Sequence, residues 1–99
     1  MDGIYSLPQI KAALTPVFGK YDVNRAILFG SYAKGTATMK SDVDILVDCK
    51  LRGLRFMGLV DDVCTILGKD ADIFNVSHII PDSPIDHEIH RTGVLLYEK

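Results

Sequence analysis

The sequence predicts a small α/β (α+β) domain in which helices flank one mixed β-sheet. Short apolar runs alternate with longer segments of helical periodicity, a pattern typical of a sheet covered by helices. The 99 residues are enough for one hydrophobic core and too few for two, so residues 1–99 are expected to form a single domain.

Three segments carry helix signals. Residues 6–9 read as a capping box, and the apolar residues that follow recur at helical spacing. They define a buried stripe of Leu7, Ile10, Leu14, Val17 and Phe18. Pro16 removes one helical hydrogen bond, so this helix is expected to be kinked there or to end just before it. A second helix is predicted over 54–67, with a stripe of Phe56, Val60, Val63 and Leu67. A third begins at residues 83–84 and ends near Gly93.

Four strands are predicted between and after these helices, over residues 25–29, 42–48, 71–76 and 94–97. The segment 42–48 alternates polar and apolar residues, which indicates a strand with one buried face. A brief helical turn is expected to start at Gly30, directly after the first strand.

Composition narrows the classes of function. The net charge of −2 and the pI of about 5.8 do not indicate a basic surface that could bind the phosphates of a nucleic acid. No direct nucleic-acid binding is therefore expected. The two cysteines, Cys49 and Cys64, match neither a disulfide framework nor a zinc spacing. No signal peptide and no apolar run of the ~20 residues that span a bilayer are present, so we expect no membrane association and a reducing, cytoplasmic location. The 47% hydrophobic content favours a partner that covers part of the surface.

Asp42 and Asp44 are the first candidate site residues. They lie two apart on a predicted strand, so their side chains point to the same face. Two such carboxylates repel each other unless a cation lies between them, and Mg²⁺ takes oxygen ligands of this kind. A solvated edge strand is the alternative explanation of the same pattern.

Gly30 and Ser31 form a candidate phosphate turn. Glycine lets the backbone turn sharply after a strand and approach a ligand closely, and Ser31 then stands at a helix N-terminus, which attracts phosphate. Alone this is most often a plain turn. Next to the strand that carries Asp42 and Asp44, the turn would bind the phosphates of a nucleoside triphosphate while the aspartates bind its Mg²⁺.

Asp72 is the candidate third carboxylate, because it lies inside an otherwise apolar strand. If that strand pairs with the strand of Asp42, two neighbouring acids raise the proton affinity of Asp72, which suits a general base. Asp70 is the competing candidate, but it belongs to a polar turn. Lys34 is either a further phosphate contact or a solvated lysine, and His87 and His90 are interpreted as surface residues.

The motif Phe29-Gly30-Ser31, ten residues, then Asp42-Val43-Asp44-Ile45 resembles the fingerprint of the DNA polymerase β-type nucleotidyltransferase superfamily. Within it the chain is most similar to the minimal nucleotidyltransferases (MNT proteins), over about residues 10–97. The resemblance implies a polymerase β palm-like fold. Lys34 stands where these proteins more often carry arginine.

The resemblance implies transfer of AMP from ATP to a hydroxyl, usually of tyrosine, on a HEPN-domain toxin, which would make the chain an antitoxin in a hetero-oligomer. Gly30 and Ser31, with Lys34, would hold phosphates. Asp42 and Asp44 would bind two Mg²⁺ ions, and Asp72 would bind one of them and activate the hydroxyl. Two alternatives stay open: a non-catalytic antitoxin that occludes its partner, and a small-molecule nucleotidyltransferase with a separate substrate-binding subunit.

Overall fold

One four-stranded mixed sheet organises the fold, with the strand order β3-β2-β1-β4. The computed structural model describes residues 4–99. The strands are β1 (Arg25–Phe29), β2 (Val43–Asp48), β3 (Ala71–Asn75) and β4 (Val94–Glu98). β1 pairs antiparallel with β2 and β4, whereas β2 and β3 run parallel. The predicted sheet flanked by helices is confirmed, with strand ends shifted by one residue at Asp42, Val76 and Glu98.

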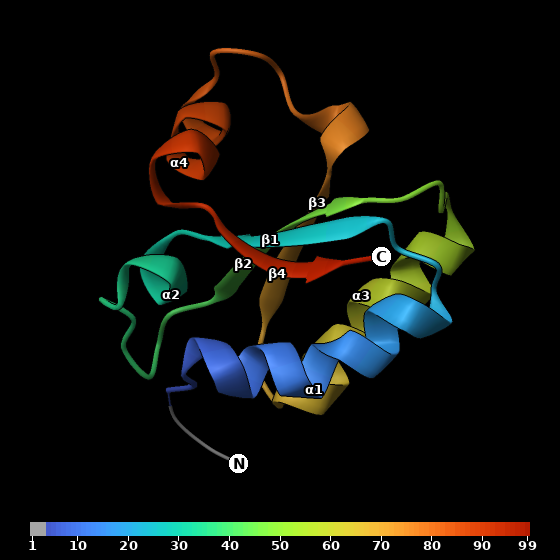
Figure 1. Cartoon of the computed structure of the whole chain (residues 1–99), viewed down its shortest axis with the longest axis horizontal. Coiled ribbons are helices and arrows are strands. Elements are labelled where there is room, and N and C mark those ends of the chain that lie inside the picture. Colours follow the sequence, from blue (N-terminus) through green and yellow to red (C-terminus); the bar gives the residue numbers. More distant parts are fainter. Residues whose placement is uncertain (1–3) are drawn as a thin grey trace.

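Helices α1 (Leu7–Lys20) and α3 (Leu54–Leu67) lie side by side against one face of the sheet (Figure 1). The main core lies between these helices and the inward side chains of the strands. Among its fully buried members are Ile10, Leu14, Phe18, Leu28, Val43, Ile45, Val47, Leu59, Val63, Leu67 and Leu96. The predicted capping box at Ser6 is present, since its hydroxyl accepts from the Gln9 N–H and the Gln9 side chain accepts from the Ser6 N–H.

Helix α1 continues through Pro16 to Lys20, so the expectation that it ends before the proline is wrong. Pro16 is exposed, and the residues on either side of it that face the core, Leu14 and Val17, are buried. Burial of this stripe therefore outweighs the one hydrogen bond that the proline removes.

The stripe of α3 differs from the prediction in its N-terminal half. Leu59, Val63 and Leu67 are buried, at a spacing of four, whereas Phe56 and Val60 are only partly buried. The segment is apolar enough that two neighbouring stripes compete in the sequence. Packing against α1 selects the one that contains Leu59.

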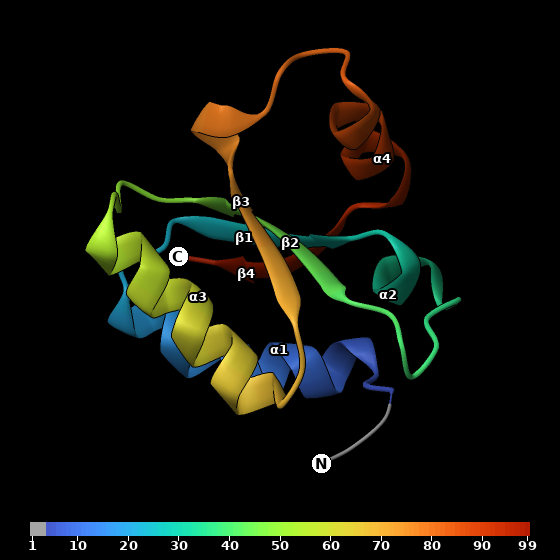
Figure 2. The same ribbon diagram turned by 180° about the vertical axis from the view of Figure 1, so that it is seen from behind.

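The second face of the sheet carries α4 (Pro84–Thr92) and the short 3-10 helix η1 (Val76–His78), on the side opposite α1 and α3 (Figure 2). Because side chains alternate along a strand, burial of Val43, Ile45 and Val47 in the main core turns Asp44 and Leu46 toward this second face. Part of the second face is apolar, with the rings of Phe29 and Phe74 5.9 Å apart. Within residues 4–99 no helix is both long and apolar enough to cross a bilayer.

Candidate active site

The phosphate turn follows β1 directly. Gly30 has φ +75° and ψ −152°, and the four-residue helix α2 (Ser31–Lys34) begins after it. The Gly30 N–H donates to the Thr92 hydroxyl at 2.9 Å. α2 is too short to act as an extended dipole. The Gly30 N–H is already bonded, so the turn offers a ligand close approach at Gly30 and the hydroxyl of the partly buried Ser31.

Gly30 lies against the carboxylate of Asp44. A Cβ at position 30 would stand 2.5 Å from Asp44 Oδ2, closer than two such atoms can approach, and the positive φ independently favours glycine. The strand register places Phe29 opposite Asp44, so the turn begins one residue beyond that pair. The two halves of the sequence motif therefore meet in space.

Asp44 and Asp72 are register partners on the parallel strands β2 and β3. They thus lie on the same face of the sheet, and Asp70, the competing candidate, lies in the turn before β3. Asp42 is exposed, one residue before β2 begins. The preference for Asp72 over Asp70 agrees with this register.

Burial, together with the negative charges of Asp72, Asp42 and Glu88, raises the pKa of Asp44 from 3.8 to about 6. Asp44 lies on the interior strand β2 and is half-buried, whereas Asp72 lies on the edge strand β3 and is exposed. Desolvation of the charged form is the largest cause of the shift at Asp44, as expected for a carboxylate on an interior strand.

Glu88 is a site residue that sequence reasoning missed. It lies on α4, its charge acts on Asp44, and its Oε1 is 3.6 Å from Lys34 Nζ. Arg91 also pairs with Glu88. The sequence holds no signal for this contact, because it depends on how α4 crosses the second face. The Lys34 side chain is thus partly exposed and paired with Glu88.

Two of the three candidate aspartates are placed to bind a divalent cation. Within residues 4–99 no three or more His, Cys, Asp or Glu side chains lie close enough together to hold a metal ion, so the predicted trio is not assembled as one group. Asp44 and Asp72 do share a face, and the charge that surrounds Asp44 favours a bound cation. Mg²⁺ typically uses one or two protein carboxylates together with substrate phosphates, and this pair fits that requirement.

Two histidines of α4 and the tyrosine after Ser31 do not belong to the site. His87 and His90 are exposed, as predicted, and face Asp82 and Asp86. Tyr32 is buried in the core, and its hydroxyl accepts from Lys69 Nζ. It therefore packs beneath the turn instead of lining it.

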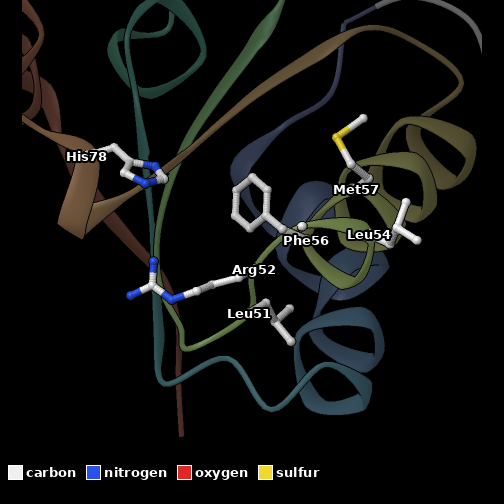
Figure 3. A pocket seen from close by; sticks show the side chains of 7 residues that line it. Leu51, Arg52, Leu54, Phe56, Met57 and His78 are labelled. Carbon is white, nitrogen blue, oxygen red and sulfur yellow. The ribbon is translucent and has the colours of Figure 1, made fainter.

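Open hollows in the surface lie elsewhere in the molecule. One, of about 580 Å³, is lined by Phe56, Leu54 and Met57 from the start of α3 and by His78 from η1 (Figure 3). Another, of about 510 Å³, lies between the sheet and α4. Neither of these two has Gly30, Ser31 or a candidate aspartate in its lining, and Asp72 is exposed to solvent.

Comparison with known families identifies the domain. The family model of the polymerase beta nucleotidyltransferases matches residues 12–99. The chain belongs to this family. Its members are nucleotidyltransferases, and the match includes the phosphate turn and all three aspartates.

Two relatives of this nucleotidyltransferase come from Methanocaldococcus jannaschii and are provisionally named protein adenylyltransferases. The first is 34% identical over 79 residues, which cover 77% of this chain and 84% of the relative. The second is 41% identical over 56 residues, which cover 54% of this chain and 57% of the relative.

Solved toxin–antitoxin complexes contain chains with the same fold. One complex, determined with AMP-PNP, matches with a TM-score of 0.76 and 20% identity, over 90% of this chain and 73% of that one. Another joins a tri-AMPylated Shewanella oneidensis HEPN toxin to an MNT antitoxin and matches with a TM-score of 0.71 and 16% identity, over 94% of this chain and 73% of that one. The fold expected from the sequence is confirmed, and this MNT antitoxin shares it.

Proposed function

We propose that this nucleotidyltransferase transfers AMP from ATP, with Mg²⁺, to a hydroxyl of a HEPN-domain toxin and thereby acts as its antitoxin. The observation that carries the proposal is the Asp44–Asp72 pair next to the Gly30 turn. The relatives named as adenylyltransferases and the fold shared with MNT antitoxins support the choice of nucleotide and partner.

The turn and its neighbours bind the triphosphate in this proposal. Gly30 lets a phosphate approach the backbone closely, the hydroxyl of Ser31 donates to a phosphate oxygen, and the Lys34 ammonium offsets part of the phosphate charge. Lys34 leaves or shares its contact with Glu88 when the nucleotide binds. Asp44 and Asp72 would hold Mg²⁺, with the negative charge of Asp42 nearby, and the ion would stabilise the charge on the entering and leaving oxygens. With a pKa of about 6, Asp44 is mostly ionised at neutral pH and available as a ligand.

Asp72 takes the proton from the acceptor hydroxyl. The hydroxyl oxygen forms a bond to the α-phosphorus, the bond from that phosphorus to the β-phosphate oxygen breaks, and pyrophosphate leaves. Asp72 is exposed on an edge strand, so a side chain of a second protein can approach it. An open site of this kind suits a hydroxyl on a macromolecule, and we propose a tyrosine of the toxin as the acceptor.

The test uses ATP labelled on its α-phosphate, Mg²⁺, the purified chain and lysate of its native host. Wild type is compared with Asp44→Asn and with Asp48→Asn, which removes a carboxylate from the far end of the same strand. Label on one protein with wild type and Asp48→Asn, absent with Asp44→Asn, supports the proposal, and mass spectrometry then identifies the protein and the modified residue.

Two other outcomes would contradict the proposal and select an alternative. Label on a small molecule and on no protein indicates a small-molecule nucleotidyltransferase. A toxin that the Asp44→Asn variant neutralises as well as wild type does indicates an antitoxin that acts by occlusion.

A further inference from the structure

The last residue of α4, Thr92, contacts the phosphate turn through its side chain. Its hydroxyl accepts a hydrogen bond from the Gly30 N–H at 2.9 Å and donates one to the Glu88 carbonyl at 2.8 Å. A threonine hydroxyl has one donor and two acceptor sites. The bond to Glu88 occupies the donor and thereby turns an acceptor site toward Gly30.

This contact continues the ladder between β1 and β4. Leu28 is the register partner of Val94, and two further residues in each direction bring Gly30 opposite Thr92. At that point β4 has given way to α4, so no strand carbonyl faces the Gly30 N–H. The Thr92 hydroxyl takes the place of a strand carbonyl and accepts the hydrogen bond of the buried Gly30 N–H.

The end of α4 is held firmly enough to define the position of Thr92. A Cβ at Gly93 would stand 2.5 Å from the Ile89 carbonyl oxygen and 3.0 Å from Ile27 Cγ2, so the chain here packs directly on β1. The Gly93 N–H also donates to the Ile89 carbonyl at 2.8 Å. Thr92 is thus fixed between a closed helix end and the start of a paired strand.

We propose that Thr92 is a positioning residue that holds the Gly30–Ser31 turn in the conformation that binds nucleotide phosphate. The inference rests on the proposed function for the ligand, and on the hydrogen bond for the mechanism. Gly30 adopts a backbone conformation far from those of an ordinary strand end, and its N–H is bonded to a side chain 62 residues away. Loss of that bond releases the turn while leaving α4 and the sheet in place.

The experiment compares Thr92→Val, which keeps the shape and removes the hydroxyl, with Thr92→Ser, which keeps the hydroxyl. Thr15→Val is the matched control, because the Thr15 hydroxyl makes the same bond to the carbonyl four residues back, in α1 and away from the turn. Amide hydrogen exchange measured by NMR reports the Gly30 N–H directly. Titration with MgATP reports nucleotide affinity, and steady-state kinetics separate KM from kcat.

We expect Thr92→Val to lose exchange protection at Gly30 and to weaken MgATP binding by about three- to tenfold, as for one lost hydrogen bond. The effect should appear in KM for ATP more than in kcat. Thr92→Ser and Thr15→Val should bind MgATP within about twofold of wild type, because neither changes the bond to Gly30.

Unchanged protection at Gly30 in Thr92→Val, or unchanged MgATP affinity in a variant that has lost protection, would overturn the inference while leaving the proposed function intact. So would a Thr92→Ser variant as weak as Thr92→Val. A wild-type protein that binds no MgATP would overturn the proposed function and the inference together, and that outcome is visible before any variant is made.

Discussion

Asp44 and Asp72 lie opposite each other on neighbouring parallel strands, and only Asp44 is partly withdrawn from solvent. Its carboxylate also touches the space that a side chain at Gly30 would need. One aspartate therefore lies beside both parts of the proposed site, the Gly30–Ser31 turn and the second carboxylate. Its pKa of about 6 is the electrostatic consequence of that position.

Asp44→Asn is expected to lower AMP transfer by more than about a hundredfold. Asp44 would hold the metal ion, and a bound metal ion stabilises transition-state charge by several kcal/mol. The measurement is release of pyrophosphate and labelling of the acceptor at saturating ATP. Asp48→Asn is the matched control and should retain activity, since Asp48 lies at the other end of β2, opposite Arg25. Substantial transfer by Asp44→Asn would refute the assigned role.

Asp44→Asn should also stabilise the protein without ligand above pH 6. The pKa of Asp44 is raised in the fold from 3.8 to about 6, so between these pH values the folded state binds more protons than the unfolded state. Its contribution to the unfolding free energy is therefore present below about pH 4 and lost as pH rises through about 6. The asparagine variant avoids this loss.

Urea unfolding at pH 4 and at pH 8 measures the effect. We expect the variant to gain on the order of 1 kcal/mol over wild type at pH 8, once solvent screening of this half-exposed group is allowed for, and little at pH 4. Added Mg²⁺ should then stabilise wild type and not the variant, because only the former keeps the ligand. A variant less stable than wild type at pH 8 would contradict the electrostatic account.

Gly30→Ala tests the close approach to Asp44. The new Cβ has both an unfavourable backbone conformation and a 2.5 Å contact with the carboxylate. Gly53→Ala is the matched control, since Gly53 has a similar conformation (φ +57°, ψ −129°) with no atom within 4 Å of its Cβ. Both variants should lose about 1–3 kcal/mol of unfolding free energy, whereas only Gly30→Ala should also lose AMP transfer. Equal activity in the two variants would mean that the Gly30–Asp44 contact is not functional.

The parts of the site that the sequence predicted are local patterns. Alternation along 42–48 predicts the face of Asp44, and a glycine after an apolar run predicts the turn. The apolar surroundings of Asp72, in contrast to those of Asp70, predict a strand position, and the register with Asp44 agrees. Each of these signals arises within a few residues of the position concerned.

The parts that could not be predicted depend on long-range geometry. Glu88 and Thr92 lie at the site because α4 packs over the second face of the sheet. The sequence of this nine-residue helix does not indicate where the helix packs. The burial of a carboxylate likewise depends on the strand order, because β3 is an edge strand and β2 is an interior strand. Sequence alternation gives the face of a residue and not its distance from solvent.

Leu59→Ala tests the corrected stripe of α3. Leu59 is fully buried between α3, α1 and the sheet, so truncation should cost about 2–5 kcal/mol of unfolding free energy. Leu54→Ala, in the first turn of the same helix and 90% exposed, should change it by less than about 0.5 kcal/mol. Urea unfolding, monitored by circular dichroism, measures the unfolding free energy of both variants. A similar loss in the two variants would indicate that the helix is rotated from the described position.

Lys34, a candidate phosphate contact, has its ammonium 3.6 Å from Glu88 Oε1. If its ammonium moves to the triphosphate, Lys34→Gln should raise KM for ATP by about three- to tenfold and weaken its dependence on salt, because one charge-assisted contact is lost. Lys34→Arg should stay within about twofold of wild type, since a guanidinium offers the same charge and more donors. Lys40→Gln is the control, an exposed lysine that forms no ion pair through its side chain within residues 4–99. If Lys34→Gln behaves like Lys40→Gln, the lysine serves only to hold Glu88, and the triphosphate depends on the Gly30 turn and the aspartates alone.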